Sequence, residues 1–318
     1  MNILKKAVFF FCAESIDIVA PRVFFAVTNL FNLHETDIMI DGFPVFRHID
    51  KQGNQFDFVR TKKVLSHNYL GYLPTINLYF SFYDFAGIIT WHAGQNAPDA
   101  IFTVHSTGDV NTGHFGPVHP QYMRNLLLAM EKFRIVESLH DFKVTTEATH
   151  WSGVVYSSGS PALIPQFAVP LLDIEIGSSQ QFWTNPAAAR VIASSLFCVF
   201  TQDGLTVANL LCAGGVHFEP AFASAVFQTW NQHAFGISHI IANQWLITGR
   251  YEEEGGQAKL EACVHSIRGG IAGIAIHDNL KGIYKDQFRI LAAKYEIPVF
   301  KHQLLRRPEE IPGLKPEK

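Results

Sequence analysis

The chain has 318 residues, of which 48% are hydrophobic and 17% are charged, and its formal net charge is −3. This length and composition allow a sizeable buried core, which is typical of a compact globular protein and excludes a disordered or collagenous chain. The slightly negative charge argues against a broad basic face, so binding of duplex DNA is not expected. Binding of one end of a nucleic acid remains compatible with this charge.

The chain begins with the pattern of a strand followed by a helix. Residues 3–12 form an apolar run rich in Val and Phe, as in a strand that is buried on both faces. This run meets Glu14 too early for a signal peptide, and no convincing cleavage site follows. Residues 15–31 suit a helix, and residues 37–66 carry an Asp-Gly turn between alternating segments, which predicts a β-hairpin insertion.

Strand patterns then alternate with helix patterns to the end of the chain. The expected strands cover 87–92, 99–108, 142–149, 171–177, 206–215, 234–241, 271–278 and 297–302. The expected helices cover 119–138, 187–197, 220–230, 256–267 and 282–295. This order predicts an α/β protein with three α/β/α layers around a mostly parallel mixed sheet, in one domain over 1–302 with a tail over 303–318.

Polar side chains recur where the expected strands end, which is where ligands bind in sheets of this kind. These residues are His105, Glu147, Thr149, His150, Asp173, Glu175, His217 and His239. An ionised Glu175 in so apolar a strand needs a cation, donors or a metal beside it. Glu175 therefore either belongs to a functional site together with Asp173 or has a purely structural role in an ion pair with an arginine.

Imidazoles from separate loops can also gather around a zinc ion. His105 is the preferred ligand in its His-rich segment because a strand holds it, whereas His114 and His119 fit a loop better. His150 can turn outward from its strand end, and His217 follows a glycine pair, Gly214 and Gly215, whose amides suit an anion. Each of these residues is equally compatible with a structural role.

Several motifs are absent, which narrows the class of enzyme. The chain has no G-x-S-x-G elbow, no P-loop, no H-E-x-x-H helix and no G-x-G-x-x-G turn. Its four cysteines are scattered in apolar runs without a C-x-x-C pair, as in reduced cytoplasmic proteins. No apolar segment reaches the roughly 18 residues of a membrane span, so we expect a cytoplasmic protein that does not bind membranes.

Together these segments resemble the D-aminoacyl-tRNA deacylases of the archaeal and plant type. The resemblance rests on the ordered blocks TVHSTGD, EATHWSG, DIEIGSSQQFWTNPAAARVIA, CAGGVHFEPAF and FGISHI, with ITWHAG before them. It implies a fold similar to peptidyl-tRNA hydrolase and nucleoside phosphorylase, zinc dependence, and hydrolysis of the ester between a D-amino acid and the end of a tRNA. The chain departs from the pattern at Trp151, which replaces a second histidine, and at Phe218 and Ser238.

The resulting hypothesis is a metal-assisted hydrolase. Zinc would be held by some of His105, His150, His217 and His239 together with a carboxylate. Glu147 or Glu175 would take a proton or orient an imidazole, and Thr149 with the amides of Gly214 and Gly215 would stabilise the oxyanion. The terminal adenosine would stack on Trp151 or Phe218. Two alternatives stay open: a nucleoside phosphorylase or hydrolase on the same sheet, and a catalytically degenerate protein that binds an RNA end.

Overall fold

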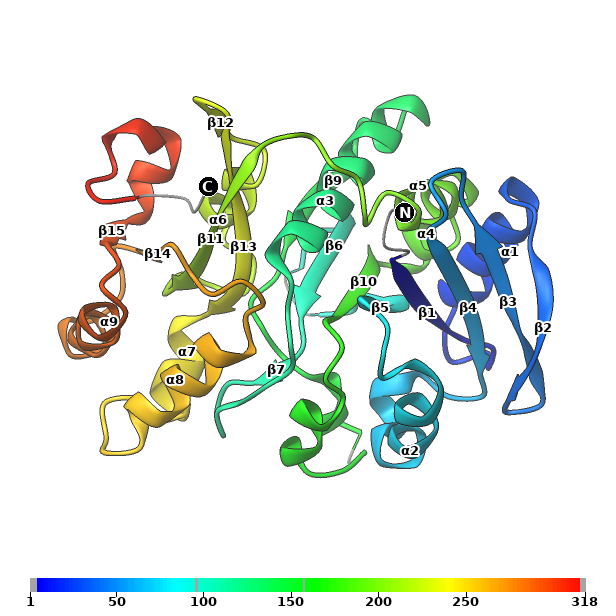
Figure 1. Cartoon of the computed structure of the whole chain (residues 1–318), viewed down its shortest axis with the longest axis horizontal. Coiled ribbons are helices and arrows are strands. Elements are labelled where there is room, and N and C mark those ends of the chain that lie inside the picture. The colour runs from blue at the N-terminus through cyan, green and yellow to red at the C-terminus, as the bar shows by residue number, and fades with distance from the viewer. Residues whose placement is uncertain (1–4, 95–96, 157, 315–318) are drawn as a thin grey trace.

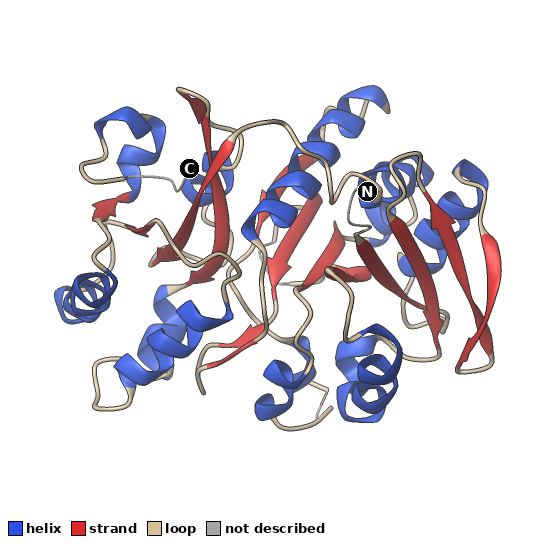
Figure 2. Ribbon diagram, viewed as in Figure 1, coloured by secondary structure: helices blue, strands red, loops and turns tan. Residues whose placement is uncertain are grey.

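The computed structural model describes residues 5–94, 97–156 and 158–314, which form two β-sheets covered by helices (Figure 1 and Figure 2). The strands of the first sheet are β1 (Lys6–Cys12), β2 (His34–Ile40), β3 (Phe43–Ile49), β4 (Gln55–Thr61), β5 (Phe85–Trp91), β6 (Ala100–Ser106), β9 (Lys143–Thr146) and β10 (Leu171–Ser178). The strands of the second are β11 (Thr206–Ala213), β12 (Thr229–Trp230), β13 (His233–Ile241), β14 (Gly273–Ile276) and β15 (Val299–Lys301). A small third ribbon pairs β7 (Gly108–Asp109) with β8 (His114–Phe115).

The first sheet has the order β2-β3-β4-β1-β5-β10-β6-β9. Its centre, β4, β1, β5 and β10, is parallel, whereas β6 runs antiparallel to β10 and β9 runs parallel to β6. The predicted hairpin is present as β2 and β3, with positive φ angles at Asp41 and Gly42 in its turn. It is not an insertion outside the main sheet, because β4 continues from it and pairs with β1.

The second sheet has the order β12-β13-β11-β14-β15, and all its strands except the short β12 are parallel. The α/β class with a mixed, mostly parallel arrangement is therefore confirmed, but the strands divide between two sheets where one was expected. Hydrogen bonds join the sheets after β9: Ala148 donates to the carbonyl of His217, and Thr149 donates to that of Ile240, each at 2.8 Å. The segment at 147–150 thus lies at the seam between the sheets.

Helices cover both sheets. They are α1 (Ala20–Leu30), α2 (Tyr69–Phe80), α3 (Pro120–Val136), α4 (Gln180–Trp183), α5 (Pro186–Leu196), α6 (Pro220–Ala225), α7 (Asn243–Thr248), α8 (Gly256–Ser266) and α9 (Gly282–Tyr295). Short 3-10 turns occupy Leu65–Asn68, Ser152–Val154, Pro161–Gln166, His302–Arg306 and Pro308–Glu310. The predicted helices are confirmed within two residues at α3, α5, α8 and α9, and α1 begins five residues later than expected. The helix expected over 220–230 is too long, because α6 ends at Ala225 and residues 229–230 form β12. Helices α2, α4 and α7 were not predicted.

The core explains why the central strands read as continuous apolar runs. Residues 7–12 of β1 are at most 2% exposed, because helices pack on both faces of the strand. Around it, Phe9 and Phe58 stack with ring centroids 5.8 Å apart. A second apolar cluster lies between the second sheet and α8 and α9. Within the described parts of the chain, no helix combines the length and apolarity that a membrane crossing requires.

Candidate active site

One face of the first sheet carries a buried row of ionisable side chains. Asp173 and Glu175 alternate along β10, so they share a face, and His105 on antiparallel β6 lies directly opposite Asp173. Nε2 of His105 is 3.8 Å from Oδ2 of Asp173 and 3.7 Å from Oε1 of Glu175. The shared face of Asp173 and Glu175 follows from their spacing, and antiparallel β6 brings His105 beside both carboxylates.

Burial and mutual charge interactions change the pKa values of His105, Asp173 and Glu175. Burial acts to lower the pKa of His105, but the charges of Asp173 and Glu175 raise it to about 10, so a metal that binds this imidazole would release its proton. Burial, reinforced by the negative charge of Glu147, raises the pKa of Glu175 to about 7. Burial also raises the pKa of Asp173. The carboxylates therefore lie where a cation stabilises them.

Glu147 lies at the centre of the second group of side chains, fully buried at the seam. Its Oε2 accepts a hydrogen bond from Nε2 of His217 at 2.7 Å and lies 3.4 Å from Nε2 of His92. Burial acts to raise the pKa of Glu147, but the contacts with His217 and His92 lower it well below its ordinary value. Among the described residues, Oε1 of Glu147 has no hydrogen-bond partner, and the same is true of Oε2 of Glu175.

His150 links these two groups. Its Nδ1 donates to the carbonyl oxygen of Ala148 at 2.9 Å, which leaves the lone pair of Nε2 available. Its ring stacks on that of His105 with centroids 3.8 Å apart. Burial and the positive charge of His105 lower the pKa of His150 to about 3, so the ring is neutral, as a metal ligand must be.

The side chains meet in three sets whose candidate ligand atoms all lie within 4.8 Å of one another. The sets are His92, Glu147 and His217; His105, Glu147 and His150; and His105, Asp173 and Glu175. Imidazole and carboxylate donors at this separation suit zinc, which binds both at about 2.1 Å. The buried carboxylate oxygens without partners fit a cation as well. Glu147 and His105 each belong to two of the sets, and Glu147 is the carboxylate that joins the two sets containing a pair of histidines, so we call it the hub of the site.

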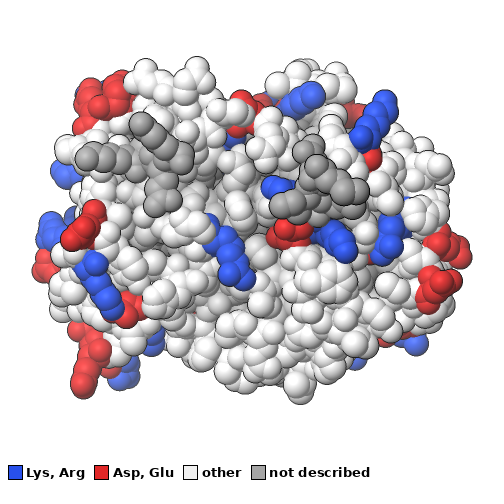
Figure 3. Space-filling view, in the orientation of Figure 1, with Lys and Arg blue, Asp and Glu red and all other residues white. Residues whose placement is uncertain are grey.

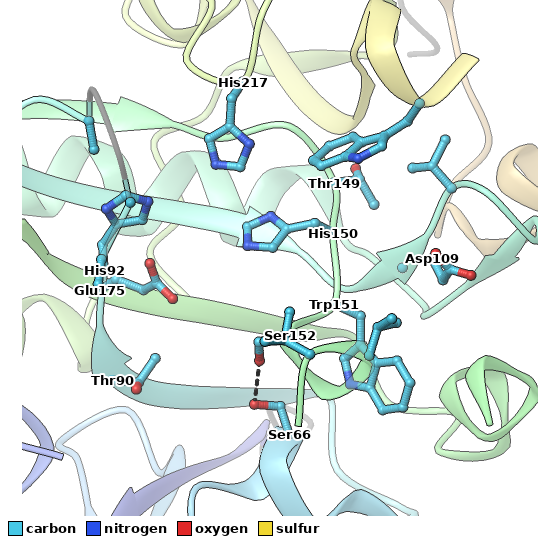
Figure 4. Close-up of a pocket in the computed structure, with 18 of the residues that line it drawn as sticks. Ser66, Thr90, His92, Asp109, Thr149, His150, Trp151, Ser152, Glu175 and His217 are labelled. Carbon is cyan, nitrogen blue, oxygen red and sulfur yellow. Dashed lines mark hydrogen bonds between the residues drawn. The ribbon is translucent and has the colours of Figure 1, made fainter. Parts of the chain in front are cut away.

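The cluster opens into a cavity of about 950 Å³. In Figure 4 the rings of His92, His150 and His217 surround an open space beside the carboxylate of Glu175. Among the described residues, the wall contains no Lys or Arg, and its only carboxylates are Glu175 and Asp109. The cavity is therefore suited to a neutral or cationic group rather than to a phosphate.

His239 lies apart from this cluster, which argues against the expected ligand role. Its Nε2 donates to Ser266 at 2.9 Å, and its Nδ1 accepts from the hydroxyl pair Ser106 and Thr149 at 2.9 and 3.1 Å. Burial lowers the pKa of His239 to about 3. Thr149 lines the cavity, but its hydroxyl is bonded to Ser106, His239 and the amide of Ile240, which argues against a role in binding an oxyanion.

The structure also argues against the expected roles of the glycine pair and of Trp151, although Trp151 lines the cavity. The amide of Gly214 donates to the carbonyl of Ile241, and that of Gly215 donates to Asn279, so neither amide is available to a substrate. Their positive φ angles instead make the turn that carries His217. Trp151 is only 4% exposed and packs edge-on against Tyr69, so it offers no open face for stacking.

The remaining candidates divide between the cavity and its surroundings. Phe218 lines the cavity as expected, with its ring 5.1 Å from that of His92. His114 and His119 belong to none of the three sets. The candidate ligands inferred from sequence omitted His92, although the strand ending ITWH carries the same signal as the other sites, a histidine directly after a buried strand. Trp245 also lines the cavity and had no sequence signal beyond its place after β13.

Comparison with known proteins identifies the family. A model of the D-aminoacyl-tRNA deacylase family matches residues 80–300, more than two thirds of the chain. The D-aminoacyl-tRNA deacylase of Archaeoglobus fulgidus is 29% identical over 127 residues, which are 38% of this chain and 41% of that protein. The corresponding enzyme of Thermococcus onnurineus is 24% identical over 226 residues, 67% of this chain and 74% of that protein.

The fold agrees with one solved structure over nearly its whole length. A crystal structure described as a conserved protein of unknown function superimposes with a TM-score of 0.73 and 19% identity, covering 96% of this chain and 98% of that one. The chain spans less than half the length of the Archaeoglobus relative and 32% of the Haloarcula marismortui relative. The family match and the ordered sequence blocks nevertheless agree, and the chain belongs to the D-aminoacyl-tRNA deacylase family.

Proposed function

We propose that the protein hydrolyses the ester bond between a D-amino acid and the terminal ribose of a tRNA in the cytoplasm, with zinc as its cofactor. Membership of the family supports the reaction class. The observation that carries the proposal is the position of Glu147, which is buried behind the cavity wall and contacts His92 and His217, two residues that line a cavity large enough for an aminoacyl-adenosine. Such a pairing of acid and imidazole is suited to moving a proton during hydrolysis.

Three residues have distinct roles in this proposal. Glu147 holds the Nε2–H of His217 and fixes the orientation of that ring toward the cavity. His150, neutral and anchored through Nδ1, presents the lone pair of Nε2. Glu175, whose pKa is raised to about 7, can accept or release a proton near neutral pH. Zinc, held by members of the three sets, would supply Lewis acidity and lower the pKa of a water ligand.

Only the end of the tRNA needs to enter the cavity. On the face shown in Figure 3, Lys and Arg are scattered among Asp and Glu and form no continuous basic stripe. This distribution favours recognition of the aminoacylated end over recognition of a long helical stem. The phosphorylase alternative loses support, because the amides of Gly214 and Gly215 are occupied and no Lys or Arg lines the cavity.

The test compares His150→Ala and His217→Ala with the wild type in turnover of a D-aminoacyl-tRNA and of its L counterpart. His114→Ala is the matched control, because this histidine lies outside the three sets. We expect both site variants to lose at least about a hundredfold in kcat/KM, the usual contribution of an acid-base or ligand group, and the control to retain full activity. Wild-type rates in both variants would contradict the proposal, and tRNA binding without any product would favour the degenerate binder.

A further inference from the structure

One end of the cavity presents side chains that suit a nucleobase. Trp245 follows β13 and lies half-buried, with its ring centroid 5.7 Å from that of His217 and 6.0 Å from that of His150. Phe218 lies on the other side of His217, at a centroid distance of 4.9 Å. Aromatic faces beside a hydrolytic centre bind bases by stacking, and the indole has the largest such face.

Gln244 adds a polar edge beside this indole. Its side chain is exposed on the cavity wall, and within the described part of the chain its amide makes no hydrogen bond. Only its backbone carbonyl is engaged, by the hydroxyl of Thr248. A glutamine amide has a donor and an acceptor in the arrangement that matches N7 and N6 of adenine, whereas the corresponding edge of guanine presents two acceptors, N7 and O6.

At the opposite end of the cavity the aromatic rings already pack on one another, and Trp91 lies there with its ring centroid 5.9 Å from that of His67. There the rings of His67 and Tyr156 stack on one another with centroids 3.5 Å apart, so each already covers a face of the other. The nearby hydroxyls of Ser66 and Ser152 bond to one another at 2.8 Å, as Figure 4 shows. No side-chain amide of the described residues lines that end to read the edge of a base.

We propose that Trp245 stacks on the terminal adenine of the substrate and that Gln244 reads the edge of this base. The inference rests on the proposed function and names the subsite that orients its substrate. Only one ribose separates the base from the ester carbon, and the short distances from Trp245 to the rings of His150 and His217 match that spacing. Because no Lys or Arg lines the cavity, the subsite holds the nucleoside while the phosphates remain outside.

The test measures the binding of free adenosine and guanosine by calorimetry to the wild type and to Trp245→Ala, Trp245→Phe and Gln244→Ala. Ile247→Ala is the control, since this residue is exposed on the same short helix and does not line the cavity. We expect about tenfold weaker adenosine binding in Trp245→Ala, with partial recovery in Trp245→Phe. Gln244→Ala should lose most of the preference for adenosine over guanosine.

The outcome is independent of turnover, because adenosine carries no ester. Adenosine affinity that is unchanged in Trp245→Ala, or no adenosine binding by the wild type, would overturn the inference even if the deacylase activity is found. Conversely, binding that depends on Trp245 in a protein without deacylase activity would keep the subsite and refute the proposed function. Thermal melting of each variant separates a lost contact from a lost fold.

Discussion

Replacing Glu147 with Gln is the most informative single change, because the side chain keeps its shape and loses only its charge. In the wild type, Oε2 of Glu147 accepts from His217 at 2.7 Å and lies 3.4 Å from His92, with no exposure to solvent. A hydrogen bond to a charged group contributes about 1.5 to 3 kcal/mol. The hydrogen bond from His217 therefore places roughly 1.5 to 3 kcal/mol of interaction on this one atom, and His92 adds an ion-pair contact at 3.4 Å.

The amide would orient His92 and His217 less well and would bind a cation more weakly. We expect kcat/KM for a D-aminoacyl-tRNA to fall by about 10² to 10⁴, together with a lower zinc content. Initial rates and elemental analysis on the same preparation provide the measurement. Glu261→Gln is the control, because Glu261 pairs with Lys294 outside the cavity. A Glu147→Gln variant that stays within threefold of the wild type would refute the assignment of Glu147 as the hub.

Three further predictions concern stability. Asn185→Ala removes the side chain that caps α5 and should cost about 1 kcal/mol in chemical denaturation without altering turnover. His239→Leu removes the hydrogen bonds of the buried imidazole with Ser106, Thr149 and Ser266 and should cost roughly 2 to 4 kcal/mol with unchanged zinc content; loss of zinc from the folded variant would instead make His239 a ligand. Burial lowers the pKa of His119 from 6.5 to about 4. Above about pH 6.5 this histidine is neutral in both the folded and the unfolded chain, so it does not reduce the free energy of unfolding. As the pH falls from 6.5 to about 4, the unfolded chain binds the proton more readily and the free energy of unfolding decreases. The decrease in the free energy of unfolding is at most about 3 kcal/mol. A His119→Gln variant whose free energy of unfolding falls as much as that of the wild type between pH 6.5 and 4 would contradict this prediction.

Periodicity in the sequence was sufficient to predict part of the site. Asp173 and Glu175 alternate on one strand, so their common face follows from the period of two, and His105 is held by a strand as expected. Strand direction does not follow from an apolar run, which is why the antiparallel position of β6 and the split into two sheets were missed. For the same reason, the apolar segment around His105 did not indicate that this residue lies opposite Asp173 and Glu175 on a neighbouring strand.

Tertiary contacts decided the other outcomes. His217 and His239 each lie near the end of a buried strand and look alike in the sequence. They differ because His217 meets Glu147 from β9, whereas His239 meets two hydroxyls at the seam. In the same way, Trp151 has the composition of a stacking residue, but Tyr69 from α2 covers it. Partners that are distant in sequence leave no local pattern.

The most direct test of the site measures zinc and activity together on one purified sample. We predict bound zinc, turnover of D-aminoacyl-tRNA that is lost on chelation, and recovery when zinc is restored. Full turnover by the metal-free protein would contradict the account, because the three sets of imidazoles and carboxylates around Glu147 would then not serve as a metal centre.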